Sequence, residues 1–268
     1  MRQLILENYV VKNGLIKLTG KDYKYLRQVL RTKVGDMIEV RLKDQTLWGS
    51  SLVSIDDKTK CITLQLCNEI NSESSVTRGV KASELQNENS CDYYLFQFIP
   101  KPQKFEMIVR QATECGVKKI IPVIGEYSDK SSVKALQSSK QERLERIIKE
   151  ARQQSGSPVD SQVLEPLTIE DSIAFWKEVS EGKENLALVL SERNDFSESL
   201  RTCLDKKENI KCVGVAVGSE GGISPQEIEI LRKNGLFHAI HFDVNILRCE
   251  TAALYGMAAI QTAISDKS

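Results

Sequence analysis

The stretch VGSEGGISPQEIEILRKNG, residues 217–235, places three glycines and one carboxylate directly before a helix start. Gly218, Gly221 and Gly222 surround Glu220, and they follow the apolar run KCVGVAV. At the carboxyl end of a strand, such glycines permit positive φ and let a ligand approach the backbone. The spacing fits neither the GxGxxG dinucleotide fingerprint nor a Walker A loop, which ends in GK[ST]. A ligand-binding loop and a tight turn without a ligand both stay open.

A second polar group, in NILRCETAALYGMAAI (245–260), follows the apolar run FHAIHF. Arg248 and Glu250 flank Cys249 where the last helix is expected to begin. Two opposite charges at the carboxyl end of a strand, beside a glycine loop, would form a cleft with both charge signs. An Arg–Glu ion pair that only stabilises the helix start is the alternative interpretation, and spacing alone does not separate the two.

The elements expected to position these residues alternate between strands and helices. LALVLS, KCVGVAVG and FHAIHF are short, near-continuous apolar runs, as in strands buried on both faces of a parallel sheet. Ser224 suits the N-cap of the helix after the glycine loop, Pro225 suits its first position, and Glu227 completes a capping box. Upstream, FEMIVRQATECG predicts a helix, VKKIIPVIG predicts a strand, and Ser139 with Glu142 predicts a further capping box.

The first 70 residues predict a small β-barrel, because short apolar runs alternate with turn residues: LILENYVV, LIKLTG, DMIEVRL, LWGSSLVSI and CITLQL. One helix interrupts them at DYKYLRQVLR, and its apolar face is expected to contain Tyr23, Leu26, Val29 and Leu30. Arg27 and Arg31, four residues apart, are expected to project together from the opposite side. These arginines either contact phosphate groups or only keep the helix soluble.

Residues 68–91 are polar, contain no aromatic residue and are expected to form a linker or surface insertion. The chain is therefore divided into a barrel at 1–70, a polar linker or insertion at 71–91 and an α/β domain at 92–268. Lys and Arg outnumber Asp and Glu in residues 1–50 and 101–155. These positive charges either contact phosphate groups on one side of the protein or only form a solvated surface.

The composition is that of a soluble globular protein, with 41% hydrophobic and 28% charged residues and a formal net charge of zero. No apolar run approaches the ~20 residues of a membrane helix, and the N-terminus reads as a first strand, so a cytoplasmic location is expected. The seven cysteines contain no CxxC pair and are expected to be reduced. The only histidines, His238 and His241, point to opposite faces of a strand, so no metal is expected.

The segments GSEGGISPQE (218–227) and NILRCETA (245–252), in this order near the C-terminus, resemble the SPOUT-class methyltransferases. They resemble more closely the enzymes that methylate N3 of a uridine in small-subunit (16S) ribosomal RNA, whose pattern is G-P-E-G-G followed by L-G-x-R-I-L-R-x-E-T-A. Further segments resemble the same family: YLRQVLRTKVGD (25–36), FQFIPKPQKFEMIVRQATECGVKKIIP (96–122) and EARQQSG (150–156). The resemblance covers nearly the whole chain apart from residues 68–91.

The resemblance implies a PUA-like N-terminal β-barrel, a C-terminal α/β domain with a deep trefoil knot, and a homodimer. It also implies S-adenosylmethionine as the methyl donor and ribosomal RNA or the small ribosomal subunit as the partner, with no membrane and no metal. Three loops at strand ends would form the cofactor pocket. The residues implied are Leu190, Ser191, Gly218, Gly221, Gly222, Ile246, Leu247, Arg248 and Ala252.

Methyl transfer to a ring nitrogen depends on orientation and charge placement. Because N3 of uracil carries a proton at neutral pH, a base or a stabilising cation would assist the reaction. We expect Arg248 to stabilise the uridine anion, and Glu250 either to accept the proton or to hold the arginine in place. Glu220 is instead expected to orient a loop by accepting backbone amides. The candidates for phosphate contact are Arg27, Arg31 and Arg152.

Several positions depart from the family pattern, among them Gln153, Ser157, Ser219, Asp243 and Asn245. Lost arginines would weaken or alter the contact with RNA, and Asp243 puts a charged side chain where a glycine lets the backbone pass near the pocket. The alternative function is therefore a knotted RNA-binding or ribosome-associated protein that has lost methyl transfer. Binding of S-adenosylmethionine without transfer to ribosomal RNA would select that alternative.

Overall fold

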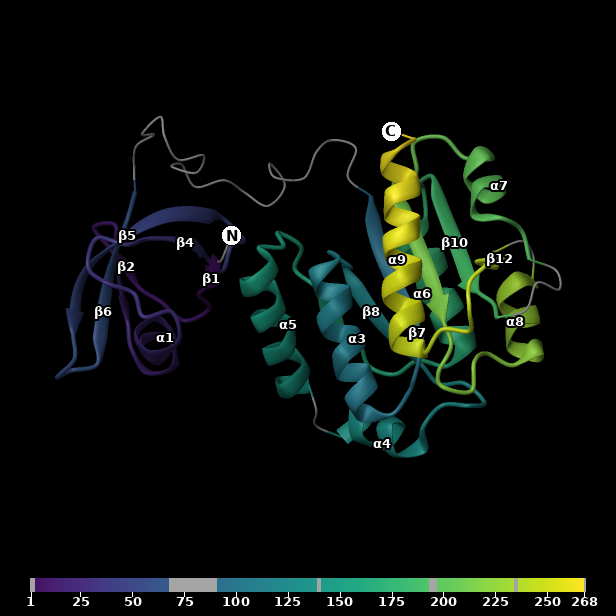
Figure 1. The fold of residues 1–268 in the computed structure, drawn as a ribbon, viewed down its shortest axis with the longest axis horizontal. Helices are drawn as coiled ribbons and strands as arrows, with labels where there is room; N and C mark the ends of the chain where they lie inside the picture. The colour runs from purple at the N-terminus through teal and green to yellow at the C-terminus, as the bar shows by residue number, and fades with distance from the viewer. Residues whose placement is uncertain (1–2, 68–90, 139–140, 193–196, 234–235, 268) are drawn as a thin grey trace. The chain divides into compact units, whose positions relative to one another are not determined.

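The computed structural model describes residues 3–67, 91–138, 141–192, 197–233 and 236–267. The chain forms two compact units, Met1–Asn87 with Arg152–Pro158, and Glu88–Ala151 with Val159–Ser268, both drawn in Figure 1. Most of the linker predicted at 71–91 lies outside the described residues, and so does Ser139 of the second predicted capping box. No helix of the described residues is long and apolar enough to cross a membrane.

The first unit contains one six-stranded sheet in the order β1-β4-β5-β6-β3-β2, antiparallel except for the pair β1–β4. Its strands are β1 (Gln3–Ile5), β2 (Val11–Lys12), β3 (Leu15–Leu18), β4 (Met37–Arg41), β5 (Leu47–Asp56) and β6 (Cys61–Leu66). All five predicted apolar runs form strands, and the first run divides into β1 and β2. Alternate side chains along β3 and β6, such as Ile16 and Leu64, are fully buried in the core of this unit.

The helical segment of the first unit differs from the prediction in its second half. It begins as α1 (Gly20–Lys24) and continues as the π-helical turn η1 (Tyr25–Val29). A π-turn forms i→i−5 hydrogen bonds, so the residues that follow are rotated relative to a regular α-helix. Tyr23 and Leu26 are buried as predicted, but Val29 is 65% exposed. Leu30 is partly buried and packs on the core of this unit, so Val29 alone departs from the predicted apolar face.

Arg31 lies beyond this helix, because the chain leaves the helical conformation after Leu30. Arg31 has a φ of 54°, the left-handed conformation that commonly ends helices. The amide and hydroxyl of Thr32 both donate to Leu26 O, at 3.0 and 3.1 Å, and close the helix end. The prediction that Arg27 and Arg31 project together from one helix face is therefore wrong.

The second unit contains a six-stranded sheet in the order β12-β10-β11-β7-β8-β9, in which every pair is parallel. The strands are β7 (Asp92–Phe98), β8 (Lys119–Val123), β9 (Gln162–Val163), β10 (Asn185–Leu190), β11 (Cys212–Val217) and β12 (His238–Ile240). The predicted parallel α/β sheet is confirmed. All six residues of β11 are buried, as expected of a central strand covered on both faces.

Helices cover both faces of this sheet. They are α3 (Pro102–Glu114), α4 (Lys130–Ser138), α5 (Gln141–Ser155), α6 (Ile169–Ser180), α7 (Leu200–Asp205), α8 (Pro225–Arg232) and α9 (Cys249–Ser265). In Figure 1, α3 and α9 lie side by side over one face. Side chains alternate along β7, so Leu95 packs with α3 and α9, whereas Phe96 packs with Trp176 of α6 on the other face. All seven cysteines are free, as predicted.

Candidate functional site

The loops at the carboxyl ends of β10, β11 and β12 line a cavity of about 870 Å³ in the second unit. Because parallel strands end at the same edge of a sheet, loops that are distant in sequence meet there. Small-molecule sites commonly measure about 300–1,000 Å³. All nine residues implied for the cofactor line this one cavity: Leu190, Ser191, Gly218, Gly221, Gly222, Ile246, Leu247, Arg248 and Ala252.

The glycine loop is a tight turn that also forms part of the cavity wall. Gly222 has a φ of 78°, and its amide donates to Ser219 O at 3.0 Å. A Cβ atom added at Gly218 would lie 2.6 Å from the carbonyl carbon of Gly222, closer than the packing allows. The side-chain amide of Gln97 on β7 is buried and donates to Gly218 O at 2.9 Å, which holds the turn against the neighbouring strand. The two interpretations of the glycines are therefore compatible.

The helix after the glycine turn begins as predicted. Ser224 is the N-cap of α8, and it forms the expected capping box with Glu227. The Glu227 carboxylate also accepts from the amide of Glu126, at 2.6 Å, and Ser219 Oγ donates to Tyr127 O at 2.9 Å. These two bonds fix the loop after β8 to the glycine turn. As a result, Tyr127 lines the cavity beside the glycines.

A cluster of charges lies where α3, the glycine turn and α9 meet. Lys104 Nζ is 3.5 Å from Glu220 Oε1 and 3.4 Å from Glu250 Oε2. The amide of Lys101 donates to Glu220 Oε1 at 3.2 Å, so Glu220 orients a backbone segment as predicted. Cys249 Sγ donates to Glu250 Oε2 at 3.3 Å. The carboxylate of Glu250 therefore pairs with a lysine rather than with the arginine two residues before it.

The environment of this cluster keeps Glu250, Lys104 and Cys249 in their usual charge states at neutral pH. Burial opposes ionisation of Glu250, but its hydrogen bonds and the Lys104 cation outweigh it and lower the pKa of that carboxyl. Desolvation opposes the charge of Lys104, but the surrounding acidic groups prevail and raise the pKa of the ammonium. Burial and then the bond to Glu250 raise the pKa of the Cys249 thiol to about 12. The thiol is thus a neutral hydrogen-bond donor.

Arg248 is the N-cap residue of α9 and lines the cavity. Its side chain is exposed, and it makes no ion pair with any residue that the structure describes. Its guanidinium is therefore available to a bound anion. Glu250, by contrast, does not line the cavity, but it contacts two residues that do, Lys104 and Cys249.

Sequence reasoning missed Lys104 and Tyr127 as lining residues. Both follow strands of the same sheet, since Lys104 comes shortly after β7 and Tyr127 shortly after β8. The rule that ligands bind beyond the carboxyl ends of parallel strands, applied to all strands, would have selected both segments.

Two of the departures from the family pattern, Gln153 and Ser157, lie in the segment that belongs to the first unit. Gln153 Oε1 accepts from Ile5 N at 3.1 Å, and Gln3 Nε2 donates to Ser157 O at 3.1 Å. Gln153, Ser157 and Gln3 are all buried. These positions therefore stabilise the packing of the segment on β1. Asn245 lines the cavity, and Asp243 is exposed in the same loop.

The three arginines predicted to contact phosphates have different surroundings. Arg27 forms a two-point ion pair with Asp57, with both N–O distances 3.0 Å. Arg152 is 4% exposed, and its Nη2 donates to Gln45 Oε1 at 2.7 Å. Arg31 is exposed. Of the three side chains, that of Arg31 is the most accessible to a phosphate group.

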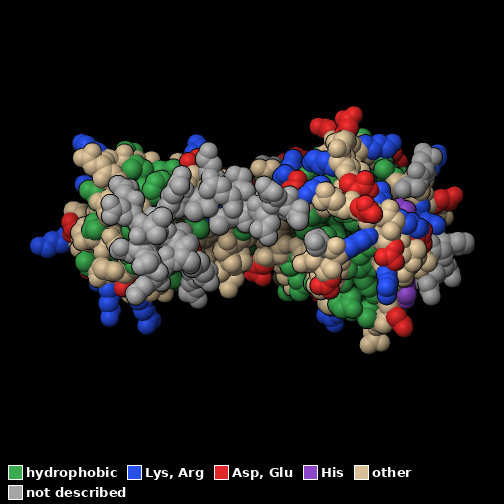
Figure 2. Space-filling model, turned by 90° about the horizontal axis from the view of Figure 1, so that it is seen from above, with side chains coloured by type: hydrophobic (Ala, Val, Ile, Leu, Met, Phe, Trp, Pro, Cys, Tyr) green, Lys and Arg blue, Asp and Glu red, His purple; other side chains and the backbone are tan. Residues whose placement is uncertain are grey.

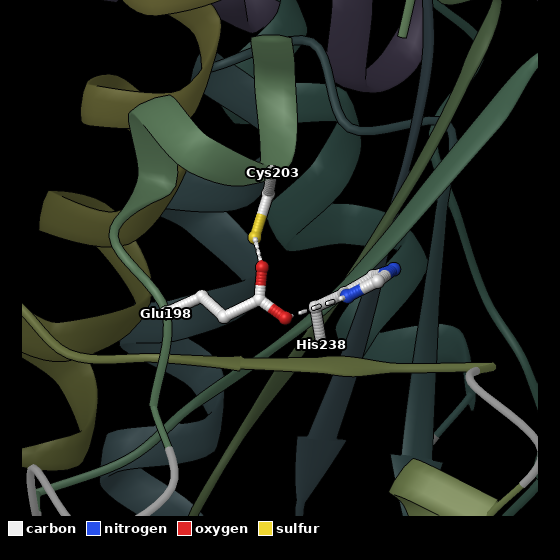
Figure 3. Close-up of side chains that lie close together, drawn as sticks. All are labelled: Glu198, Cys203 and His238. Atoms are coloured by element: carbon white, nitrogen blue, oxygen red, sulfur yellow. Dashed lines mark hydrogen bonds and ion pairs between the residues drawn. The ribbon is translucent and has the colours of Figure 1, made fainter. Parts of the chain in front are cut away.

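One group of potential metal ligands lies outside the cavity, where Glu198, Cys203 and His238 come together (Figure 3). Glu198 Oε1 is 3.7 Å from His238 Nδ1, and Cys203 Sγ donates to Glu198 Oε2 at 3.9 Å. The ammonium of Lys206 lies 2.6 Å from the same Oε2 and neutralises the carboxylate. Burial, followed by the negative charge of Glu198, raises the pKa of Cys203 to about 11. The Glu198 carboxylate thus already has protein partners, a hydrogen bond from Cys203 and an ion pair with Lys206.

Family models match both parts of the chain. The model of an RNA methyltransferase domain matches residues 87–261, and the model of an RNA methyltransferase PUA domain matches residues 18–65. The first match covers more than half of the chain and includes every residue that lines the cavity.

Relatives of this chain in several bacteria are ribosomal RNA small subunit methyltransferases. The chain is 25% identical to ribosomal RNA small subunit methyltransferase E 2 of Borreliella burgdorferi, with 99% of each chain covered. It is 34% identical to ribosomal RNA small subunit methyltransferase E of Aquifex aeolicus, over 61% of this chain and 65% of that one.

The structure resembles that of ribosomal RNA small subunit methyltransferase E from Neisseria gonorrhoeae bound to S-adenosyl methionine. The TM-score is 0.74 at 22% identity, with 98% of each chain covered. At this identity the likeness concerns the fold. It confirms the predicted fold class, an α/β domain of the SPOUT type with an N-terminal PUA-like domain.

Proposed function

Because this chain belongs to the RNA methyltransferase family, we propose that it transfers a methyl group from S-adenosylmethionine to N3 of a uridine in small-subunit (16S) ribosomal RNA. The observation that carries the proposal is the cavity, which gathers three strand-end loops, a glycine turn and the exposed Arg248. The expected cytoplasmic location and the expected trefoil knot stay predictions.

The residues present fit the proposed cofactor. The glycine turn offers backbone to a ligand at the cavity wall, because Gly218, Gly221 and Gly222 line the cavity and carry no side chains. Leu190 and Leu247 offer apolar surface to an adenosine, while the acidic side chains Glu192 and Glu220 suit a positively charged sulfonium. When bound, S-adenosylmethionine supplies a methyl group on that sulfonium.

The chain's own residues would orient the uridine and stabilise its charge. As N3 loses its proton, negative charge spreads over the uracil ring, and the Arg248 guanidinium at the cavity wall would stabilise it. Leu190 and the glycine turn would hold S-adenosylmethionine, which would supply the methyl group, and the cavity would orient N3 of the uridine toward it. The proton from N3 would pass to solvent water. The cavity walls would hold the two partners in line.

Of the two roles expected for Glu250, we favour orientation over proton transfer. A carboxyl whose pKa is lowered is a weak base, and Glu250 lies behind Lys104 rather than on the cavity wall. Arg248 precedes it by two residues at the helix start. The carboxylate therefore supports the position of the arginine through the backbone.

Ribosomal RNA, or the small ribosomal subunit, is the proposed partner, and of the three candidate arginines the exposed Arg31 is the proposed phosphate contact. Substitution Arg31→Ala should weaken RNA binding to all sequences alike and reduce the slope of log K against log salt concentration by about one. An unchanged slope would exclude Arg31 as a phosphate contact.

A homodimer is also part of the proposal. Figure 2 shows an area of hydrophobic side chains open to solvent on the second unit. On α9, Leu254 and Tyr255 are 37% and 41% exposed, and Ile246 in the preceding loop is 80% exposed. Such residues gathered near one helix suit burial against a second copy. Sedimentation equilibrium should give a dimer for the wild type and a monomer for Leu254→Asp; a monomeric wild type would exclude the homodimer.

The decisive experiment is nucleoside mass spectrometry of small-subunit RNA that lacks the modification. The RNA, naked or in assembled subunits, is incubated with the protein and S-adenosylmethionine. We expect 3-methyluridine with the wild type and none with Arg248→Ala. Exposed Arg110 on α3, which lies outside the cavity, provides the control variant Arg110→Ala with unchanged product.

Two results would contradict the proposal. A different methylated nucleoside would retain the enzyme class and reject the uridine N3 as the target. Binding of S-adenosylmethionine without any methylated product, in naked RNA and in subunits, would favour the non-catalytic RNA-binding protein.

A further inference from the structure

Lys104 connects two of the elements that form the cavity. It lies in the first turn of α3, which follows β7. Its ammonium is 3.5 Å from Glu220 in the glycine turn after β11 and 3.4 Å from Glu250 in the first turn of α9, after β12. Three loops of the same sheet edge are thus joined by one positive charge.

Each carboxylate in this arrangement has a second contact that limits its freedom. Glu220 accepts from the backbone amide of Lys101, and Glu250 accepts from the thiol of Cys249. The side chains of Glu220 and Glu250 are 29% and 14% exposed, so water screens their charges only in part. Without the ammonium, two partly buried negative charges would lie close together, which is unfavourable.

We propose that Lys104 is a positioning residue for methyl transfer, which fixes the start of α9, and with it Arg248, relative to the glycine turn. The proposal rests on the proposed function. Arg248 is the N-cap of α9 and stands two residues before Glu250, so an ion pair that fixes Glu250 also fixes where Arg248 enters the cavity. Since catalysis here depends on orientation, a displacement of about 1 Å can lower the rate about 100-fold.

A phosphate contact is the competing role for a lysine at this place. Two carboxylates surround the single ammonium, so the cluster carries net negative charge and repels a phosphate group. The geometry therefore favours a lysine that holds protein groups in place.

The substitution Lys104→Met removes the charge and keeps most of the side-chain length. We expect kcat for methyl transfer to fall about tenfold or more, with little change in KM for RNA. Lys104→Arg should restore most of the rate, because a guanidinium can bridge the same two carboxylates. Lys134→Met removes a lysine from the exposed surface of α4, outside the cavity, and should leave kcat unchanged. Thermal melting identifies a temperature at which every variant is folded.

A second readout does not depend on turnover. The charged groups near the Glu250 carboxylate are Lys104 from α3 and Glu220 from the glycine turn, with the titratable Cys249 on its own helix. Carbon-13 NMR titration of this carboxyl, assigned with Glu250→Gln, should give a higher pKa in Lys104→Met than in the wild type. Burial raises the pKa of the Glu250 carboxyl, and without the Lys104 cation less remains to oppose that effect.

Three outcomes decide between the explanations. Unchanged kcat and an unchanged Glu250 titration in Lys104→Met overturn the positioning role, while transfer by the wild type upholds the proposed function. A raised KM for RNA, with unchanged kcat and a salt slope smaller by about one, assigns Lys104 to a phosphate and also overturns it. If the wild type transfers no methyl group, the proposed function fails, and the Glu250 titration still decides whether Lys104 holds that carboxylate.

Discussion

Substitution of Gly218 by alanine should open the glycine turn and weaken cofactor binding. The added Cβ would lie 2.6, 2.7 and 2.9 Å from the carbonyl carbon, Cα and carbonyl oxygen of Gly222. All three are backbone atoms, which cannot rotate away as a side chain can. The turn itself must therefore move, and it forms part of the cavity wall.

The expected magnitude follows from the cost of overpacking, which is typically about 1–3 kcal/mol. Since about 1.4 kcal/mol corresponds to a factor of ten in an equilibrium constant, Kd for S-adenosylmethionine should rise about five- to 140-fold. Gly218→Ala introduces no backbone strain of its own, because a positive φ is found at Gly222 and not at Gly218.

Isothermal titration calorimetry of the wild type and Gly218→Ala measures this change directly. Gly182→Ala is the matched control, because Gly182 has a φ of 69° but nothing within 4 Å of an added Cβ, and it does not line the cavity. The left-handed backbone at position 182 should strain the alanine variant by about 1–2 kcal/mol and lower its melting temperature, without changing Kd for S-adenosylmethionine. A Kd for Gly218→Ala within about twofold of wild type would refute the reasoning, since it would mean that the turn does not shape the cofactor site.

Four further predictions concern activity, stability and pH. Arg248→Ala should lower kcat about 100-fold or more, and near-normal turnover would remove Arg248 from the mechanism. Ser224→Ala should reduce the free energy of unfolding by about 1 kcal/mol through loss of the α8 N-cap, measured by urea titration. Trp176→Ala, at a fully buried site, should cost about 3–5 kcal/mol, and a smaller loss would mean that the site collapses around the gap. The hydrogen bond from Arg27, then that from Tyr23, lowers the pKa of Asp57, so this contribution to stability is present above the ordinary aspartate pKa and is lost as pH falls through the lowered value. Asp57→Asn should remove that acid-side dependence, and an unchanged profile of unfolding against pH would contradict it.

The pattern of apolar runs was sufficient to predict the parallel sheet and the position of the loops that line the cavity. LALVLS and KCVGVAVG form β10 and β11, which are buried on both faces as is typical of central parallel strands. FHAIHF forms β12 at the edge of the sheet and is partly buried. Once the strands were identified, the shared edge at their carboxyl ends brought Leu190, Gly218 and Ile246 to one cavity. The capping box at Ser224 was equally local, because it depends on residues three positions apart.

The tertiary structure alone decided which charged side chains meet. The sequence offered Arg248 as the neighbour of Glu250, but the carboxylate pairs with Lys104, which is 146 positions earlier in the chain. Likewise, Arg152 and Gln153 look like surface residues of a helix, yet both are buried in the first unit through bonds to Gln45 and Ile5. Helical periodicity describes a face of a helix, but it does not say what covers that face.

The sequence by itself thus determined the main strands and the glycine turn, because these depend on backbone conformation and on residues close together in the chain. The π-turn that displaces Arg31, the loop that carries Tyr127 to the cavity and the bridge made by Lys104 arose only in the tertiary structure. Each of these depends on the packing of segments that are distant in sequence, and the strength of an ion pair depends on burial and on distance. Neither quantity is encoded in residue spacing.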